Sequence, residues 1–242
     1  MRDMWKTLRE AGIQGEERYV LTCMAEEHLG DSLIFLLDGT LVCGTPNAGA
    51  AEYIRSHEYQ GPEIIEGTDG IRWFWQKLER EKEILILGAG HISRCLEQQY
   101  RYIGYHCTIL DDRAEFADPN LFPSAAEVIC GDYDAVLSQL PLSRFSGAVV
   151  VTRGHTWDRL CLHHLLPAKI PYIGMLGSRR RVEVVKKLLR EEGVDPAWME
   201  QLYAPVGLDI GSETPEEIAL AIAAETLAVL RRRRGGHLCK KG

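Results

Sequence analysis

The chain has 242 residues, 45% of them hydrophobic, and a formal net charge of −7 at pH 7. This length suits one large domain, or a Rossmann domain with a smaller partner domain. The negative charge argues against general nucleic-acid binding, which needs a basic face. No apolar stretch approaches the ~20 residues that span a membrane, and the first residues lack the apolar core of a signal peptide. We therefore expect a cytoplasmic protein that binds neither nucleic acid nor membrane.

The cysteines favour a reducing compartment. The chain has 7 of them, an odd number, and none forms a Cys-x-x-Cys pair. Cys95, Cys107 and Cys130 lie in apolar stretches, and Cys161 lies in a leucine-rich segment. We expect these four to be buried, reduced thiols rather than ligands of a structural metal.

Residues 1–80 are predicted to form a small α+β domain. Its predicted strands are residues 19–24, 32–37 and 40–43. Asp38-Gly39 is a strong signal for a two-residue hairpin between the last two of these strands. Residues 72–82 are expected to be a helix or a linker, with Trp73, Phe74 and Trp75 packed at the junction between the domains.

Residues 83–234 alternate strands with helices, which predicts a doubly wound parallel sheet of the Rossmann type, an α/β fold. The predicted strands are residues 84–87, 107–110, 127–130, 148–152 and 171–175. The predicted helices are residues 91–103, 157–166 and 179–192, and a last helix that starts at Thr214-Pro215-Glu216-Glu217 and runs to Arg231–Arg234. Thr214 and Glu217 form a capping box. We interpret the four arginines as a solvated helix end rather than a nucleic-acid patch.

The first strand runs into a variant of the dinucleotide fingerprint, Gly88-Ala89-Gly90-His91-Ile92-Ser93. Gly88 permits the tight turn, and Gly90 lets a phosphate approach the backbone. The N-terminus of the following helix then offers free N–H groups and a partial positive charge. The second strand ends at Asp111, 23 residues after Gly88, where a carboxylate can bind a ribose hydroxyl. The alternative for Asp111 is a polar strand end without a ligand.

Two neighbours of Asp111 are further candidates. Asp112 is a weaker candidate for the ribose contact. Arg113 either binds an additional phosphate or pairs with Asp112.

The fourth strand is followed by Thr152-Arg153-Gly154-His155. In a Rossmann sheet this strand end lies beside the first one, at the switch point of the topology. His91 and His155 should then face one crevice, where they can bind a metal, move protons or contact a ligand. The alternative is that both are loop histidines without a role.

Two later segments complete the candidate site. Gly177-Ser178-Arg179-Arg180-Arg181 opens a helix with cations, which oppose the helix dipole by ~0.3–1 kcal/mol each. These arginines either hold an anion such as a phosphate or are solvated. A glycine-rich loop then carries Asp209 and Glu213, which either bind the ring edge of a ligand or belong to a well-capped connection.

Together these segments resemble the xanthine dehydrogenase accessory factor family, XdhC/CoxI. The resemblance covers roughly residues 83–230. It rests on motifs that follow one another in order: Gly88-Ala89-Gly90-His91, Asp111-Asp112-Arg113, Thr152-Arg153-Gly154-His155, Gly177-Ser178-Arg179-Arg180 and Gly207 to Ile218.

The resemblance implies a cofactor chaperone rather than an enzyme. Family members bind molybdenum cofactor, protect it during sulfuration and deliver it to a molybdenum hydroxylase of the xanthine dehydrogenase type. A cysteine desulfurase is a further implied partner, and members tend to be homodimers. The same motifs then imply phosphate contacts at the Gly88–His91 turn and the arginines, and ring-edge contacts at Asp209 or Glu213.

The N-terminal domain departs from the family pattern. Members carry a Gly-Gly-Cys segment after the hairpin, whereas this region reads Leu-Val-Cys-Gly-Thr-Pro, with Cys43 before the glycine. No role is therefore carried over to Cys43.

Two other functions remain open on the residues alone. An NAD(P)-dependent oxidoreductase would use the same glycines and Asp111, with His91 or His155 as proton donor. A nucleotide-sensing module without chemistry is the third possibility. The sequence identifies neither the client enzyme nor the form of the cofactor, mononucleotide or dinucleotide.

Overall fold

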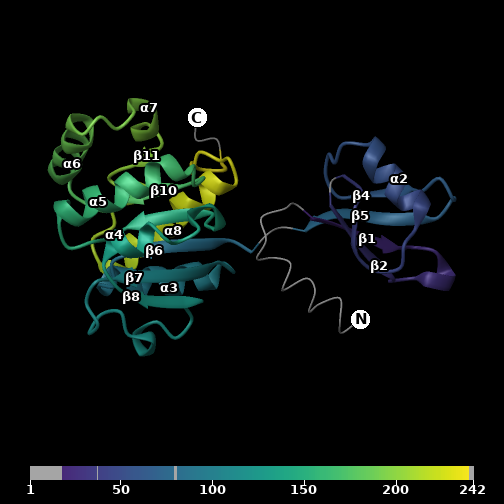
Figure 1. Cartoon of the computed structure of the whole chain (residues 1–242), viewed down its shortest axis with the longest axis horizontal. Coiled ribbons are helices and arrows are strands. Elements are labelled where there is room, and N and C mark those ends of the chain that lie inside the picture. Colours follow the sequence, from purple (N-terminus) through teal and green to yellow (C-terminus); the bar gives the residue numbers. More distant parts are fainter. Residues whose placement is uncertain (1–17, 37, 79–80, 240–242) are drawn as a thin grey trace. The chain divides into compact units, whose positions relative to one another are not determined.

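The computed structural model describes residues 18–36, 38–78 and 81–239. The chain divides into two compact units, the first ending at residue 80 and the second beginning at residue 81 (Figure 1).

The N-terminal unit is an antiparallel sheet covered on one face by a helix. Its strand order is β3-β2-β1-β5-β4. The elements are β1 (Arg18–Cys23), β2 (Ser32–Leu36), β3 (Leu41–Cys43), α2 (Ala48–Ser56), β4 (Glu63–Glu66) and β5 (Arg72–Leu78), with a 3-10 turn at Glu26–His28. The core between sheet and helix holds the buried side chains of Leu21, Ile54 and Trp75. The predicted α+β composition is confirmed.

The prediction of a helix or linker over residues 72–82 was wrong, since Arg72–Leu78 is strand β5. Aromatic residues favour strands, and those at positions 73 and 75 point to the same face of a pleated strand. Trp73 and Trp75 are 5% and 0% exposed and belong to the core of the N-terminal unit. β5 pairs with both β1 and β4, so it holds the sheet together.

The predicted hairpin exists, but its turn is longer than two residues. β2 and β3 pair antiparallel and are connected by residues 37–40. The Leu36 N–H donates to the Thr40 carbonyl at 2.9 Å, and Gly39 has a φ of 80°. Residue 37, the last of the predicted strand, lies outside the described residues.

The C-terminal unit is the predicted parallel α/β sheet. Its six strands have the order β11-β10-β9-β6-β7-β8, and every pair in it is parallel. The strands are β6 (Glu83–Leu87), β7 (His106–Asp111), β8 (Glu127–Cys130), β9 (Gly147–Val150), β10 (Ile173–Met175) and β11 (Leu202–Tyr203). The helices are α3 (His91–Tyr102), α4 (Tyr133–Leu137), α5 (His155–Leu165), α6 (Arg179–Glu191), α7 (Pro196–Met199) and α8 (Pro215–Leu230). When β6 is taken as the first strand and β11 as the sixth, the order reads 6-5-4-1-2-3, which is the Rossmann strand order. The predicted fold class is therefore confirmed.

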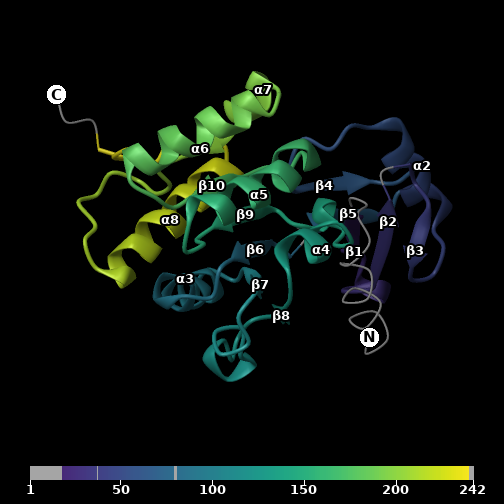
Figure 2. The ribbon, with the colours of Figure 1, turned by 60° about the vertical axis from the view of Figure 1, so that its left-hand side comes forward.

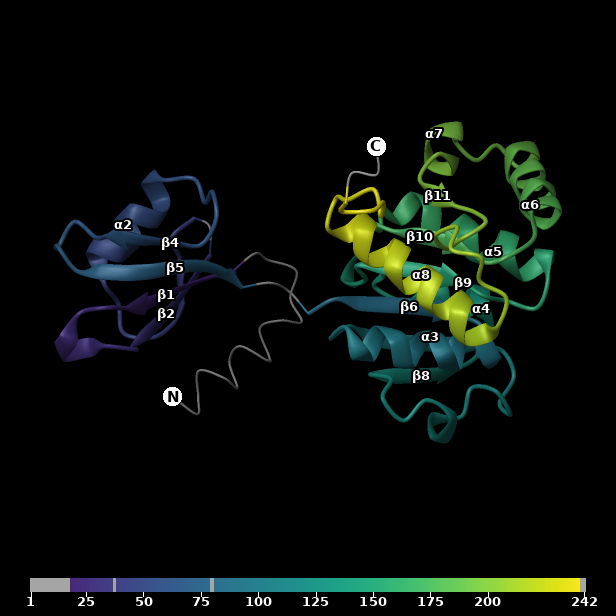
Figure 3. The same cartoon turned by 180° about the vertical axis from the view of Figure 1, so that it is seen from behind.

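Helices cover both faces of this sheet. α3 and α8 pack together on one face, over side chains such as Ile86 and Ile109 (Figure 3). α4, α5 and α6 pack on the other face, with α5 between its two neighbours (Figure 2). The sheet is buried on both sides, as a parallel sheet requires.

The termini of the helices follow the predicted signals. Gly104 and Gly193 have φ values of 79° just after α3 and α6, where a left-handed residue closes a helix. The predicted capping box at Thr214 and Glu217 is present, with Pro215 in the first turn of α8. α8 ends at Leu230, so Arg231–Arg234 lie just past the helix.

The short elements were not predicted, and the expectation for the thiols was only partly right. α4, α7 and β11 have at most five residues each and carry little periodic signal. Cys107 and Cys161 are buried as expected, whereas Cys95 is half-buried and Cys130 is exposed. Cys130 ends β8, which lies at an edge of the sheet, so its side chain is not enclosed.

Replacement of Trp75 should destabilise the N-terminal unit. Trp75→Ala removes a fully buried ring, and such changes cost about 3–5 kcal/mol. The neighbouring Phe74 is only half-buried, so Phe74→Ala is the matched control with a smaller loss. Urea unfolding of the full chain measures both. Equal losses for the two variants would contradict the packing described for β5.

Candidate functional site

The candidate site lies where the parallel strands of the C-terminal unit end. β6 pairs directly with β9, and the chain leaves these two strands in opposite directions across the sheet. Ligands of open α/β sheets bind in the crevice at such a switch point. The segments after β6 and β9 are the two glycine-histidine motifs singled out in the sequence.

Gly88 brings these two segments into contact. Its φ is 108°, and a Cβ at this position would lie 2.5 Å from the Val151 carbonyl oxygen. A residue with a side chain would therefore both strain the backbone and collide with the segment after β9. The predicted need for glycine at the tight turn is confirmed at Gly88.

Two helices begin at this edge of the sheet without a side-chain cap. Gly90 is the N-cap of α3 and Gly154 is the N-cap of α5, and neither helix has a capping side chain among the described residues. A Cβ built on either glycine would meet no atom within 4 Å. His91 and His155 are the first residues of the two helices, and both are exposed. Free N–H groups and partial positive charge at two adjacent helix ends form an anion-binding arrangement.

Asp111 is turned inward and already engaged. It is 0% exposed. Its carboxylate accepts from the Ala89 N–H at 2.7 Å, from the Arg113 N–H at 3.0 Å, and from Arg113 Nε and Nη2 at 2.9 Å each. Burial alone would raise the pKa of Asp111, but the hydrogen bonds from Arg113 and Ala89 outweigh it and lower the pKa below its ordinary value. A ribose hydroxyl at Asp111, as predicted, would first have to displace Arg113.

Asp112 and Arg153 connect the ends of β7 and β9. Arg153 Nη2 lies 2.8 Å from Asp112 Oδ2, whereas Arg113 Nε lies 3.8 Å from Asp112 Oδ1. Arg113 therefore pairs most closely with Asp111, and it also forms the longer ion pair with Asp112 that one alternative expected. Because β7 and β9 flank β6, the Arg153–Asp112 pair joins the two segments on either side of the glycine turn.

A buried ion pair behind the segment after β9 was missed by the sequence analysis. Asp158 is 0% exposed and accepts from Thr152 Oγ1 at 2.6 Å and from Arg181 Nε at 2.6 Å. Arg181 Nη2 also donates to the Thr152 carbonyl at 2.9 Å. Burial raises the pKa of Asp158, although both partners oppose this. The only sequence signal was an acid one turn into α5, which is ordinary for a helix start.

This ion pair gives Arg181 a different role from the other two arginines at the start of α6. Arg181 points inward to Asp158, while Arg179 and Arg180 are exposed. Gly177 precedes Ser178, whose Oγ accepts from the Arg181 N–H at 3.3 Å as the cap of α6. Arg179 and Arg180 are thus the two that remain available to an anion.

Asp209 and Glu213 lie on a loop whose base is anchored. The Val206 N–H donates to the Met175 carbonyl at 3.0 Å, and the Gly207 N–H donates to Glu225 Oε2 at 3.1 Å. Asp209 and Glu213 themselves are exposed. The loop is well capped at its far end, where Glu217 Oε2 accepts from the N–H groups of Glu213 and Thr214.

Comparison with known proteins identifies the family of the C-terminal unit. Residues 84–226 match the XdhC Rossmann domain. The chain belongs to the XdhC family. The match starts in β6 and ends in α8, and it includes the uncapped starts of α3 and α5.

Two relatives are about one-third identical to this XdhC-family chain over the residues that align. The Escherichia coli protein YqeB, described as uncharacterized, is 33% identical over 158 residues, which is 65% of this chain and 29% of YqeB. A Bacillus subtilis protein described as a probable component of xanthine dehydrogenase is 32% identical over 159 residues, which is 66% of this chain and 46% of the relative. The chain thus matches less than half the length of either relative.

A solved structure shares the fold of the whole chain. The crystal structure of a xanthine dehydrogenase from Bacillus halodurans superimposes with a TM-score of 0.75 and 23% identity, over 96% of this chain and 65% of that one.

Neither a metal site nor a spanning helix emerges from the described residues of this XdhC-family chain. Within residues 18–36, 38–78 and 81–239, no three His, Cys, Asp or Glu side chains gather as metal ligands. No helix in the same ranges is long and apolar enough to cross a membrane.

The N-terminal unit has a cavity of its own, which the sequence did not indicate. It has a volume of about 530 Å³, and its wall includes Cys23, Cys43, His28, Asp31 and Trp73. His28 Nδ1 lies 3.4 Å from Asp31 Oδ2. The Trp73 Nε1–H is buried without a hydrogen-bond partner in the described part of the chain.

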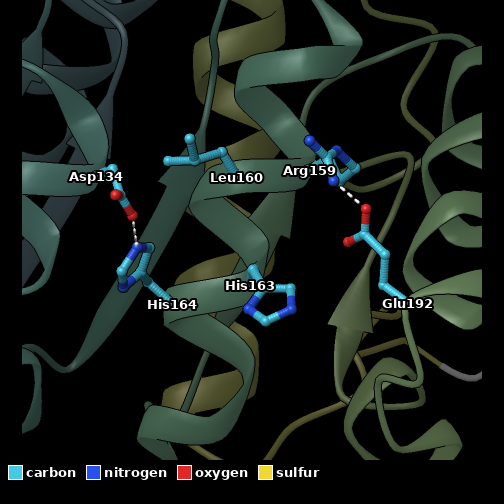
Figure 4. Close-up of a pocket in the computed structure, with 6 residues that line it drawn as sticks. All are labelled: Asp134, Arg159, Leu160, His163, His164 and Glu192. Carbon is cyan, nitrogen blue, oxygen red and sulfur yellow. Dashed lines mark hydrogen bonds and ion pairs between the residues drawn. The ribbon is translucent and has the colours of Figure 1, made fainter.

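A second pocket, of about 280 Å³, lies between α4, α5 and α6 (Figure 4). His164 Nε2 lies 2.7 Å from Asp134 Oδ1 on one side, and Arg159 pairs with Glu192 on the other. His163 lies between these two pairs (Figure 4). Each pair connects α5 to a neighbouring helix, so we assign this pocket to helix packing.

Removal of the Asp111 charge should cost stability in a pH-dependent way. Folding lowers the pKa of the Asp111 carboxyl group below the value of about 3.9 that it has in the unfolded chain. The charged carboxylate therefore stabilises the fold fully above that pH. This stabilisation is lost as the pH falls through the lower pKa of the folded protein. Asp111→Asn should therefore unfold more easily at pH 7 by about 1.5–3 kcal/mol, the contribution of a hydrogen bond to a charged group. The difference should shrink below about pH 4.

Unfolding by urea at a series of pH values measures this difference. Asp209→Asn, at an exposed position, is the control and should match the parent throughout. A loss that is the same at every pH would contradict the role given to the Asp111 charge.

Proposed function

We propose that the chain is an accessory protein that binds molybdenum cofactor and supports its sulfuration and insertion into a molybdenum hydroxylase of the xanthine dehydrogenase type. Membership of the XdhC family supports the class of function. The observation that carries the proposal is the pair of uncapped helix starts at Gly90 and Gly154, on adjacent strands.

The residues present fit the phosphate of a molybdopterin. A Cβ at Gly90 or Gly154 would meet open space, so a phosphate has room to approach both backbones. The amides of Gly90, His91 and Ile92 would donate at α3, and those of Gly154 and His155 at α5. Arg153 lies next to this arrangement and is 46% exposed on its side chain, so it can turn from Asp112 to the phosphate.

Further contacts would come from the remaining candidates. Arg179 and Arg180 are exposed at the start of α6 and would add positive charge. The carboxylates of Asp209 and Glu213 would accept from the polar edge of the pterin ring. When bound, the cofactor supplies a molybdenum with sulfur ligands, which is the chemistry of the client enzyme rather than of this chain.

The proposed partners follow from the same class of function. The Bacillus relatives are named for xanthine dehydrogenase, which supports a hydroxylase of that type as the client. A cysteine desulfurase, as sulfur donor, and a second copy of the chain are the other proposed partners. We propose that these encounters take place in the cytoplasm.

NAD(P) is the alternative ligand, and the geometry supports it less. A dinucleotide needs an acceptor for the adenosine ribose at the end of the second strand. Asp111 is buried against Ala89 and Arg113, and Asp112 is paired with Arg153. NAD(P) bound at Asp111 would therefore have to displace Arg113 from a buried carboxylate, whereas the proposed phosphate contact needs only the more exposed Arg153 to turn from Asp112.

A carboxylate placed at Gly90 should abolish cofactor binding without unfolding the protein. Like charges about 4 Å apart repel by roughly 4 kcal/mol at an effective dielectric constant of 20. We expect Gly90→Asp to retain less than a tenth of the parent's molybdenum and pterin fluorescence after purification from a host that makes the cofactor. An acid at a helix N-terminus is otherwise favourable, so the melting temperature should not fall.

Gly236→Asp is the matched control, since it adds the same charge at a glycine with open space outside the site. Titration of the parent with NADH and NADPH is run in parallel. Equal cofactor contents in the parent and Gly90→Asp would overturn the proposed site. Binding of a nicotinamide cofactor without any molybdopterin would favour the alternative.

A further inference from the structure

The cavity in the N-terminal unit lies at one end of its sheet. β1 ends there at Cys23, β3 ends there at Cys43, and β2 begins there at Ser32. These strands are antiparallel neighbours, so the end of one lies beside the start of the next. The segment that leads into α2 completes the wall through residues such as Thr45. A volume of about 530 Å³ is in the range of pockets that hold small molecules.

The buried part of the wall is apolar. Cys23, Leu33 and Trp73 are 1%, 3% and 5% exposed. Cys23 and Trp73 are opposite each other on the paired strands β1 and β5. A surface of this kind suits the apolar face of a ring. A sugar would instead bury hydroxyl groups there without hydrogen-bond partners, which is costly.

One buried donor in this wall lacks an acceptor. The Trp73 Nε1–H has no hydrogen-bond partner within residues 18–36, 38–78 and 81–239. A buried donor without a partner costs about 1–3 kcal/mol. A ligand in the cavity that carries a carbonyl oxygen or a ring nitrogen can supply the missing acceptor.

The exposed part of the wall is polar and disfavours anions. His28 Nδ1 and Asp31 Oδ2 lie 3.4 Å apart, and both side chains are exposed. The described residues of the wall include neither Lys nor Arg. The carboxylate of Asp31 would repel a phosphate or a second carboxylate. The cavity therefore favours an uncharged ligand, unlike the helix starts at Gly90 and Gly154.

We propose that this cavity binds an uncharged, planar heterocycle of one or two rings, such as a free nucleobase. The ring lies against the apolar part of the wall, with an acceptor for the Trp73 Nε1–H. Its N–H groups donate to the exposed side chains of Asp31 and Thr45. This site lies wholly within the N-terminal unit and goes beyond the proposed cofactor binding.

Titration of the full chain with hypoxanthine tests the site. This base is uncharged and planar, and it carries a carbonyl acceptor and ring N–H donors. The amide signals of Gly44 and Thr45, in the wall, should shift in NMR spectra and saturate with a Kd below about 1 mM. No binding at that concentration, or shifts confined to the C-terminal unit, would overturn the proposal.

Two related probes test the preference for an uncharged ligand. Inosine adds a ribose to the same ring, and inosine 5′-monophosphate adds a phosphate as well. The monophosphate should bind at least tenfold more weakly than inosine, because its phosphate meets Asp31 and neither Lys nor Arg in the described wall. Equal or tighter binding of the monophosphate would overturn the proposed ligand class.

Trp73→Phe tests the buried donor. It keeps an aromatic ring but removes the N–H, so the Kd for hypoxanthine should rise about fivefold to tenfold. Trp75→Phe is the matched control. Trp75 is also buried with an unpartnered Nε1–H among the described residues, but it is not part of the wall. Equal losses of affinity in the two variants would contradict the contact at Trp73.

A cavity-filling variant tests the location without relying on a hydrogen bond. Cys43→Phe enlarges a half-buried side chain of the wall and should abolish binding of hypoxanthine. Ile64→Phe, at an exposed position on β4 outside the wall, is the control and should bind like the parent. Circular dichroism establishes that each variant is folded. Unchanged binding by folded Cys43→Phe would overturn the proposed site.

The cofactor proposal and this one fail separately. Gly90→Asp, which tests the cofactor site, should bind hypoxanthine like the parent, because residue 90 is not part of this wall. Loss of hypoxanthine binding in folded Gly90→Asp would place the base in the C-terminal unit and overturn the proposal.

Discussion

The close approach of Gly88 to the Val151 carbonyl is the contact on which the candidate site depends. A Cβ at residue 88 would lie 2.5 Å from that oxygen, so only glycine allows the turn after β6 to rest against the segment after β9. The contact brings the start of α3 next to the start of α5. Without it the two uncapped helix ends would not lie side by side at the edge of the sheet.

Buried carboxylates hold this arrangement from both sides. Asp111 binds the Ala89 amide within the glycine turn, and Arg113 compensates its charge. Asp158 binds Thr152 in the segment after β9, and Arg181 compensates its charge. A buried carboxylate is costly unless it is paired and hydrogen-bonded, so neither side chain is free to move. The acids therefore orient the backbone segments that lead into α3 and α5.

This division of roles gives Asp111 a structural part in the turn that its spacing along the sequence did not indicate. Asp111 has the spacing of a ribose ligand, but its distance to Ala89 makes it part of the turn. Spacing along the chain cannot show which way a carboxylate points. Gly88 was informative about the turn because steric constraints allow few other residues at this position, whatever ligand binds.

The fold likewise has features that local sequence predicts and features that depend on contacts between distant segments. The parallel sheet was predictable because its strands contain apolar runs, such as Ile84 to Leu87, and because its last helix carries the cap formed by Thr214 and Glu217. The strand at Arg72–Leu78 was missed although its aromatic residues favour a strand, because its pairing with β1 and β4 cannot be seen in the sequence of the segment itself. The Asp158–Arg181 pair joins residues 23 positions apart, so no local sequence pattern predicts it.

The central claim is that an anion binds where α3 and α5 begin, and amide NMR of the isotope-labelled full chain tests it most directly. On titration with molybdopterin, the amides of His91, Ile92, His155 and Thr156 should shift the most and saturate together. Shifts confined to Gly44 and Thr45, in the wall of the N-terminal cavity, with no change at the starts of α3 and α5, would contradict the account.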